Sequence, residues 1–172
     1  MIVLRTPRLH LRRFTLEDAA FASELVNDPD WLRNIGDRNV HSLEDACRYL
    51  TNGPLAMYER TGFGMYVVCL TTGQPVGTCG LIRREGLEDV DIGFAFLPAH
   101  RGKGYALESA AAVMAHAADL GLTRIVAIVS PDNDASIRLI EKIGMTFERM
   151  VRMPGDTEDI RLYARVVRPA EP

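Results

Sequence analysis

A basic, glycine-rich turn joins a strand-like segment to a helix-like segment near the middle of the chain. Residues 101–106 read Arg-Gly-Lys-Gly-Tyr-Ala, after VDIGFAFLPA and before an alanine-rich stretch. The first N–H groups of a helix lack intrahelical partners, and the helix dipole adds partial positive charge there. Glycines let a phosphate approach those amides, and Arg101 and Lys103 add full charges. The turn therefore predicts an anion site, and a pyrophosphate suits it best.

Three kinds of phosphate-binding turn can be compared with this stretch. A P-loop requires GxxxxGK followed by Ser or Thr, which the sequence lacks. A dinucleotide fingerprint requires GxGxxG, and here Leu107 stands where the third glycine belongs. The pattern Arg/Gln-x-x-Gly-x-Gly/Ala is satisfied at every position by Arg101, Gly104 and Ala106. The sequence supports this third pattern.

Two further places carry side chains suited to chemistry. Asn133 and Ser136 follow RIVAIV (residues 124–129), a continuously apolar run typical of a strand covered on both faces. Their spacing alone predicts a helix N-cap and a first-turn serine. Asp91 begins the strand that leads into the glycine-rich turn. It is a candidate general base, and equally a carboxylate that satisfies nearby strand or loop amides.

Metal and disulfide chemistry are not expected. The four histidines share no ligand spacing; they are His10, His41, His100 and His116. The three cysteines form no CxxC pair, and their odd number argues against a disulfide framework; they are Cys47, Cys69 and Cys79. We expect reduced, buried thiols, as in a cytoplasmic protein.

The N-terminal part of the chain predicts a strand and two helices. Residues 8–14 alternate apolar and basic side chains, which indicates a half-buried strand. Thr15 and Asp18 form a capping-box pattern that opens a helix to about Asn27. Ser42 and Asp45 repeat that pattern, and a second helix is expected to about residue 60, interrupted at residues 52–54. Residues 27–39 read as a loop.

The remaining elements predict a single α/β domain over residues 1–172, which some schemes would class as α+β. Strands are expected near 64–70, 75–83 and 90–97, with turns at Thr72-Gly73 and Glu85-Gly86, which suits an antiparallel meander. Helices follow at about 104–120 and 134–143, closed by Gly121 and Gly144. The strand at 124–129 lies between them, and two more strands end the chain.

Bulk composition excludes several classes of protein. The chain has 172 residues, 47% of them hydrophobic, and a formal net charge of −3. That balance gives no overall attraction to nucleic acid or to an anionic membrane, and no segment approaches a membrane span. The N-terminal segment carries arginines and lacks the apolar run of a signal peptide. We therefore expect a cytoplasmic protein with neither nucleic-acid nor membrane partners.

The chain resembles the GNAT acetyltransferase superfamily over about Leu4 to Val167. The resemblance is carried by LRTPRLHLRRFTLEDA, DIGFAFLPAHRGKGYALESA, NDASIRLIEKIGM and the closing LYARV. It is nearest to the branch that contains the ribosomal-protein N-terminal acetyltransferases. It implies a mixed, mostly antiparallel twisted sheet of about seven strands, with a wedge between the fourth and fifth, flanked by about four helices.

The resemblance also implies that acetyl-coenzyme A is the donor. Phe96 and Leu97 would lie along the pantetheine arm, and the backbone amides from Gly102 to Ala106, Tyr105 among them, would hold the pyrophosphate. Asn133 would contact the arm and Ser136 would lie near the sulfur. A primary amine, either a protein N-terminus or a small molecule, would attack the thioester directly in a ternary complex.

For the chemical step, the resemblance favours Asp91 as base, and a backbone N–H near Phe96–Leu97 as donor to the carbonyl oxygen. Many relatives use a tyrosine as acid after the second cofactor helix, but EKIGMTFERM holds none, and Ser136 is the substitute. Trp31 and Arg152 are candidates for contact with the acceptor. A non-catalytic acyl-coenzyme A sensor or subunit is the alternative, and both monomer and homodimer stay open.

Overall fold

The computed structural model describes residues 1–167. They form one eight-stranded sheet with the order β1-β2-β3-β4-β5-β6-β8-β7. Residues 168–172, the end of the predicted domain range, lie outside the described part of the chain. The strands are β1 (Ile2–Arg5), β2 (Leu9–Arg13), β3 (Met65–Leu70), β4 (Pro75–Ile82), β5 (Val90–Phe96), β6 (Arg124–Val129), β7 (Thr146–Val151) and β8 (Ile160–Val166).

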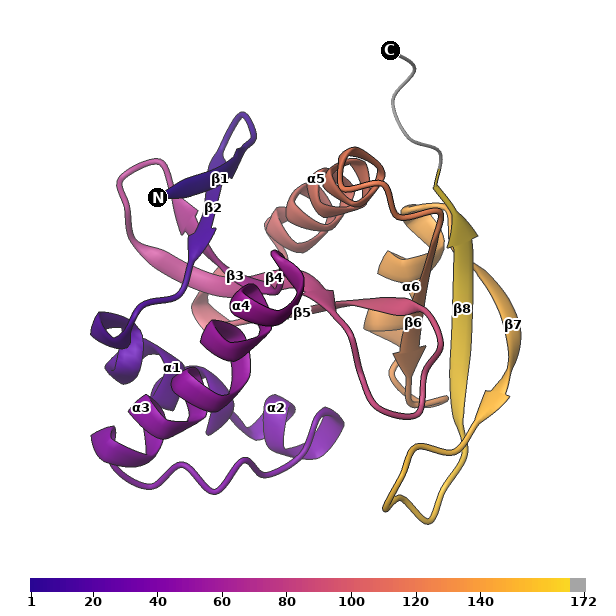
Figure 1. Ribbon diagram of the computed structural model, residues 1–172, viewed down its shortest axis with the longest axis horizontal. Coiled ribbons are helices and arrows are strands. Elements are labelled where there is room, and N and C mark those ends of the chain that lie inside the picture. The colour runs from indigo at the N-terminus through magenta and orange to yellow at the C-terminus, as the bar shows by residue number, and fades with distance from the viewer. Residues whose placement is uncertain (168–172) are drawn as a thin grey trace.

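One junction in this sheet differs from the others. All neighbouring strands pair antiparallel except β5 and β6, which pair in parallel. Their register consists of Val90 opposite Ile125 and Asp91 opposite Val126, after which the two strands separate. Figure 1 shows β6, β8 and β7 turned away from the rest of the sheet. The expected mixed sheet with a wedge between these strands is confirmed.

The sheet has one strand more than expected. Ile2–Arg5 forms β1, which pairs antiparallel with β2 at the edge of the sheet. The Thr6 N–H donates to the Leu9 carbonyl at 2.9 Å and closes the tight turn between the two strands. Four apolar residues in a row at the N-terminus were too short a signal to predict a strand, because they acquire a partner only through this turn.

The helices also exceed the expected number. They are α1 (Ala19–Val26), α2 (Pro29–Asn34), α3 (Leu43–Leu50), α4 (Ala56–Thr61), α5 (Tyr105–Asp119) and α6 (Asp134–Lys142), with short turns η1 (Leu16–Asp18), η2 (Thr51–Leu55) and η3 (Pro98–His100). The expected loop at residues 27–39 contains α2, which Asp28 caps through the Asp30 N–H and which has proline in its first turn.

The break expected at residues 52–54 is also corrected. The chain stays helical through Pro54, because η2 is a π-helical turn that continues from α3 into α4. A wider turn accommodates the proline ring and its missing N–H without ending the helix.

Most helix-end predictions are confirmed. Thr15 and Asp18 bond reciprocally as a capping box. Ser42 accepts the Asp45 N–H, but the Asp45 carboxylate accepts from the His41 N–H, so the second capping box is only half formed. Gly121 and Gly144 follow the ends of α5 and α6 with positive φ angles of 82° and 87°. These features depend on residues a few positions apart, which explains why they can be predicted locally.

Each face of the sheet has its own core. On one face, Val90, Ile92 and Phe96 of β5 belong to a cluster that includes buried residues of α5 and α6. On the other face, Ala95 and Leu97 pack against a cluster built from α1, α3 and Trp31 of α2. Figure 1 shows these two groups of helices on opposite sides of the strands. Alternate residues of β5 therefore face different helical layers.

Candidate functional site

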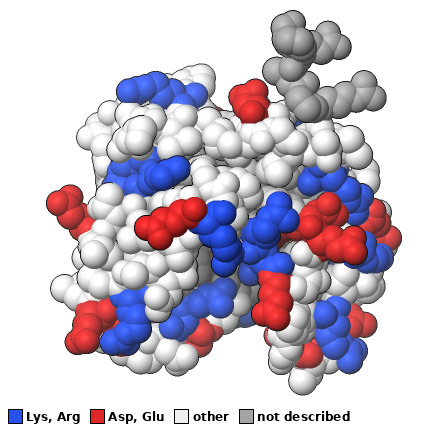
Figure 2. Space-filling model, viewed as in Figure 1, with Lys and Arg blue, Asp and Glu red and all other residues white. Residues whose placement is uncertain are grey.

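A cleft of about 1220 Å³ opens where β5 and β6 separate. Its lining comes from α2, α3, β5, the glycine-rich turn, the end of β6 and the first turns of α6. Figure 2 shows a hollow near the centre of this face, with Lys and Arg side chains on both sides of it. The volume is larger than an ordinary small-molecule pocket of roughly 300–1,000 Å³, so it has room for two substrates.

The glycine-rich turn lies in this cleft with unpaired amides. Gly102 and Gly104 have positive φ angles of 74° and 82°, a backbone conformation that residues other than glycine rarely adopt. Gly104 is the N-cap of α5, and no side chain of the described residues caps it. The first helical bond runs from the Glu108 N–H to the Gly104 carbonyl. The amides of residues 102–107 are therefore suited to an anion, and binding of one there stays a prediction.

Beside this turn, β5 offers the edge of its backbone. The Leu97 N–H donates to the Val76 carbonyl of the β4 side at 3.0 Å. Hydrogen-bonded partners alternate along an antiparallel ladder, so Ala95 and Gly93 also face β4, whereas Phe94 and Phe96 face the wedge. Leu97 is bonded elsewhere and does not line the cleft. Of the two expected donors to a carbonyl oxygen, the Phe96 N–H faces the wedge and the Leu97 N–H does not; the Phe94 N–H, which the sequence did not indicate, is a further candidate.

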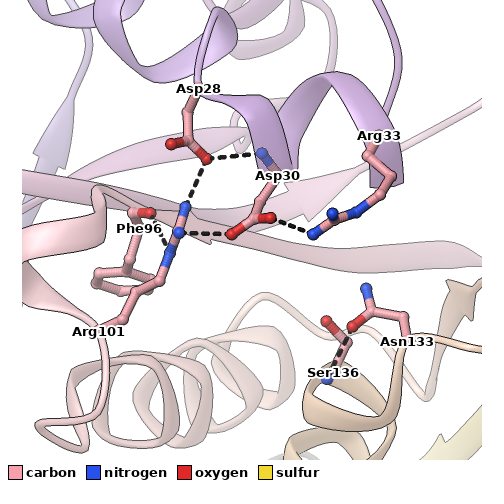
Figure 3. Close-up of polar contacts among 7 residues, drawn as sticks. All are labelled: Asp28, Asp30, Arg33, Phe96, Arg101, Asn133 and Ser136. Carbon is pink, nitrogen blue, oxygen red and sulfur yellow. Dashed lines mark hydrogen bonds and ion pairs between the residues drawn. The ribbon is translucent and has the colours of Figure 1, made fainter.

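Arg101 does not direct its charge at the anion site (Figure 3). Its guanidinium donates to Asp30 and to Asp28, each at 2.6 Å, and its Nε donates to the Phe96 carbonyl at 3.0 Å. Lys103 is exposed and absent from the lining of the cleft. The expected full charges of these two side chains are therefore not observed beside the amides. Arg101 instead connects α2 to the end of β5.

A different arginine, which the sequence did not single out, lies at the turn. The Arg8 Nη1 donates to the Lys103 carbonyl at 2.8 Å, and its guanidinium stands 4.7 Å from the centre of the Tyr105 ring. Glu108 holds Arg8 at 2.9 Å and accepts from the Thr6 hydroxyl at 2.6 Å. The partners lie about a hundred positions apart, so no local pattern could have found them.

The start of α6 forms the opposite wall of the cleft. The Asn133 side chain accepts the Ser136 N–H at 3.3 Å, so the N-cap predicted from their spacing is observed. Both residues line the cleft, as do Arg138 and Lys142 of the same helix. Figure 3 shows Asn133 and Ser136 across from the Arg101 group. Contact of Asn133 or Ser136 with a ligand stays a prediction.

Asp91 lies on the floor of the cleft. Its side chain is 1% exposed, and the Arg84 Nε donates to both of its oxygens at 3.0 and 3.1 Å. Burial raises the pKa of Asp91 to about 6, although Arg84 acts in the opposite direction. The carboxylate is therefore satisfied by a guanidinium that the sequence did not indicate. A carboxyl group with a pKa near neutrality is suited to proton transfer.

The two candidates for acceptor contact differ in position. Trp31 is buried and lines the cleft, and its indole N–H has no hydrogen-bond partner among residues 1–167. Arg152 is exposed, pairs with Asp159 at 2.9 Å, and does not line the cleft. Its position therefore gives the prediction for Arg152 no support, and contact of either residue with an acceptor stays a prediction.

The chain is similar to known proteins over these same elements. A family model described as "Acetyltransferase (GNAT) domain" matches residues 8–146. An uncharacterized N-acetyltransferase of Bacillus subtilis, YoaA, is 30% identical over 98% of both chains. The chain belongs to the GNAT acetyltransferase superfamily. The resemblance inferred from the sequence motifs is confirmed at that level.

Solved GNAT structures have the same fold. An acetyltransferase from Agrobacterium tumefaciens superimposes with a TM-score of 0.79 at 27% identity, covering 94% of this chain and 92% of the other. The ribosomal L7/L12 alpha-N-protein acetyltransferase RimL, in complex with coenzyme A, gives 0.82 at 22% identity, covering 97% and 98%. At 22% identity the second likeness shows the fold alone. The narrower resemblance to the ribosomal-protein branch stays a prediction.

Two other features, a metal-binding cluster and a membrane-spanning helix, are not found in the described part of this GNAT chain. Within residues 1–167, no three His, Cys, Asp or Glu side chains come together as a metal site would require. Over the same residues, no helix combines the length and the apolar character needed to cross a membrane.

Proposed function

We propose that this GNAT protein transfers the acetyl group of acetyl-coenzyme A to a primary amine within a ternary complex. One observation carries the proposal: the cleft unites an uncapped helix N-terminus, an unpaired strand edge and a buried carboxyl group. The first suits a pyrophosphate, the second an amide-rich arm, and the third a departing proton.

The donor would lie along β5. The amides of residues 102–107 would bind its pyrophosphate, and the wedge-facing groups of Phe94 and Phe96 would bond to the amides of the pantetheine arm. Asn133 and Ser136, at the facing end of α6, would border the thioester. Bound in this way, acetyl-coenzyme A supplies an activated acyl group beside Asp91.

Each residue then has a distinct task. Asp91 accepts a proton from the attacking amine, directly or through water, while the new C–N bond forms and the C–S bond breaks. An N–H of Phe94 or Phe96 donates to the thioester oxygen as negative charge develops there. The Ser136 hydroxyl donates to the departing sulfur. A thiolate with a pKa of about 8.5 also leaves readily without a proton, so Ser136 assists and is not essential.

The α-amine of an amino acid or peptide suits this base better than a lysine side chain. The ordinary pKa of a terminal amine is about 8, whereas that of lysine is about 10.4. The smaller gap to the pKa of about 6 at Asp91 makes deprotonation of an α-amine easier at neutral pH.

The anion site is tested by Gly104→Glu. The substitution places a bulky, negatively charged side chain at a positive-φ position beside the amides, so coenzyme A should bind at least about a hundredfold more weakly by calorimetry. Gly155→Glu is the matched control, because Gly155 also has positive φ but lies in the turn between β7 and β8, outside the cleft. Unchanged coenzyme A affinity in a folded Gly104→Glu protein would contradict the proposal.

Turnover distinguishes the enzyme from the alternative of a sensor. Thiol release from acetyl-coenzyme A is measured over a panel of primary amines, beside calorimetric binding of the donor. Release with at least one acceptor supports the acetyltransferase. Tight binding of the donor with no release for any acceptor would favour a non-catalytic acyl-coenzyme A sensor.

A further inference from the structure

The acceptor side of the cleft is rich in arginine. Four arginines from four different segments line it: Arg33, Arg38, Arg48 and Arg84. Two of them are neutralised by neighbours on their own helices, since Arg33 pairs with Asp30, and Arg48 with Asp45 and Glu44. The other two have hydrogen-bonding capacity left over.

Arg84 uses only one edge of its guanidinium. Both bonds to Asp91 are made by Nε, at 3.0 and 3.1 Å. Its two terminal amino groups have no hydrogen bond within the part of the chain that the structure describes. A guanidinium presents five N–H donors in a planar fork, so its outer edge can still bind a second anion.

Arg38 and Tyr49 face the same region. Arg38 lies in the connection between α2 and α3, and it forms no ion pair among residues 1–167. Tyr49 of α3 is half-buried and lines the cleft. Burial raises the pKa of its phenol, while the charges of Arg38 and Arg84 act to lower it, so both guanidinium groups lie within electrostatic reach of the ring. These three side chains come from separate segments and line the same cleft.

The carboxylates that line the cleft do not accept hydrogen bonds from the outer edge of Arg84 or from Arg38. Asp28 and Asp30 bind Arg101, Asp45 binds Arg48, and Asp91 binds the inner edge of Arg84. The polar groups without a partner at Arg38, Arg84 and Tyr49 are therefore hydrogen-bond donors. The group that matches two guanidinium forks is a carboxylate, because its two oxygens accept paired N–H bonds.

We propose that the amine acceptor carries a carboxylate, which binds Arg38, Tyr49 and the outer edge of Arg84 while the amine lies at Asp91. In this arrangement the guanidinium of Arg84 lies between the carboxylate of the acceptor and Asp91. That short separation fits an amino acid, whose amine and carboxylate share one carbon. An acidic side chain near a peptide N-terminus is the second source of the same group. This inference rests on the proposed transferase function and narrows its acceptor.

The experiment compares matched acceptors with and without the carboxylate. The panel contains L-amino acids, the corresponding L-amino acid amides, dipeptide amides with Asp or Asn at the second position, and spermidine. Thiol release gives kcat/KM for each, and the ratio of acid to amide is the readout. Comparing this ratio between variants cancels the different basicities of the two amines.

Three variants locate the subsite. Arg38→Gln should lower the acid-to-amide ratio about tenfold, since it removes a charge-assisted bond. Arg84→Gln should lower the ratio similarly, although it also weakens overall turnover by leaving Asp91 unpaired. Arg83→Gln is the control: it removes the same charge one position away, on an exposed residue that does not line the cleft, and should leave the ratio unchanged. Arg38 is exposed, so Arg38→Gln is expected to fold even if Arg84→Gln does not.

Each outcome has a meaning. A preference for amino acids over their amides places the carboxylate on the α-carbon, and a preference for Asp over Asn dipeptides places it in a side chain. Turnover of amines with an equal ratio in wild type and Arg38→Gln, or a preference for spermidine, overturns this inference alone. Release with no acceptor despite binding of coenzyme A removes the proposed enzyme function, and this inference with it.

Discussion

Asp91 and Arg84 form the residue pair on which the proposed chemistry depends. Asp91 is 1% exposed and Arg84 is partly exposed, so the carboxylate is shielded while its partner reaches the cleft. Removing either partner leaves a buried or half-buried charge unpaired, which is usually more costly than losing both. Substitutions in this pair should therefore change both turnover and the free energy of unfolding, and the two effects can be measured separately.

The pH dependence of turnover tests the role of Asp91. As a base it must be ionised, so kcat/KM should rise with pH up to about 6 and then lose this dependence. Asp91→Asn should lower kcat/KM about a hundredfold or more and remove the limb near pH 6, while the limb due to the amine stays. Steady-state thiol release between about pH 5 and pH 9 measures both effects. A pH profile shared by the two proteins would exclude Asp91 as the base.

The same group should affect folding in the opposite sense to an ordinary surface aspartate. Its pKa rises from the usual 3.8 to about 6 in the fold, so between these values the native state binds more protons than the unfolded chain. The free energy of unfolding should therefore fall as pH rises through this window. Urea unfolding below and above the window, at about pH 4 and about pH 7, should show a smaller decrease for Asp91→Asn than for wild type.

At the scale of elements, α2 and the end of β5 are joined by Arg101. Asp28 is almost fully buried and also caps α2 through the Asp30 N–H, so the guanidinium neutralises a carboxylate that is largely shielded from solvent. The position of α2 decides where Trp31 lies in the cleft. If the proposed function holds, Arg101 acts as a positioning residue between α2 and the end of β5.

Arg101→Gln should separate positioning from phosphate binding. We expect a loss of about 1–3 kcal/mol in the free energy of unfolding, because Asp28 is left buried without its partner. The acceptor KM should rise, while the affinity for coenzyme A changes less than about threefold, since the backbone amides are unaltered. Arg33→Gln is the control, because its exposed ion pair should contribute under about 1 kcal/mol. A large loss of coenzyme A affinity would assign Arg101 to the phosphates.

At the scale of the whole molecule, the donor would connect the two parts of the sheet. β5 and β6 share only the pairs at Val90 and Asp91, and beyond them the sheet is held together by the helices and not by strand pairing. A ligand that occupies the wedge contacts β5, α5 and α6 at once. Binding should therefore be visible as increased stability of the whole fold.

Thermal unfolding with and without coenzyme A tests this linkage. At a ligand concentration of about a hundred times Kd, one site should add about 2.7 kcal/mol to the free energy of unfolding. For a domain of this size the melting temperature should rise by roughly 5–10 °C. Gly104→Glu should abolish the shift and Gly155→Glu should keep it. A similar shift with ATP or NAD but none with coenzyme A would favour a nucleotide-binding enzyme instead.

Local interactions explain what the sequence alone could determine about this protein. The turn at Gly102 and Gly104, the N-caps at Asn133 and Ser42 and the capping box at Thr15 depend on backbone angles and on partners within four positions. The strand and helix order, and the family, follow from patterns of the same short range. The position of the glycine-rich turn was therefore predictable, whereas the wedge beside it was implied only by the family resemblance.

Only the tertiary structure decided how the charged side chains pair. Arg101 finds Asp28 and Asp30 over seventy positions away, and Arg8 finds the turn from the first hairpin. Arg84 reaches Asp91 because the chain reverses between β4 and β5 and brings both to one side of the sheet. A long, flexible side chain can reach many partners, and which one it binds depends on the folded backbone. For this reason the sequence could locate the glycine-rich turn proposed to bind an anion, whereas the arginines of the proposed acceptor site came together only in the tertiary structure.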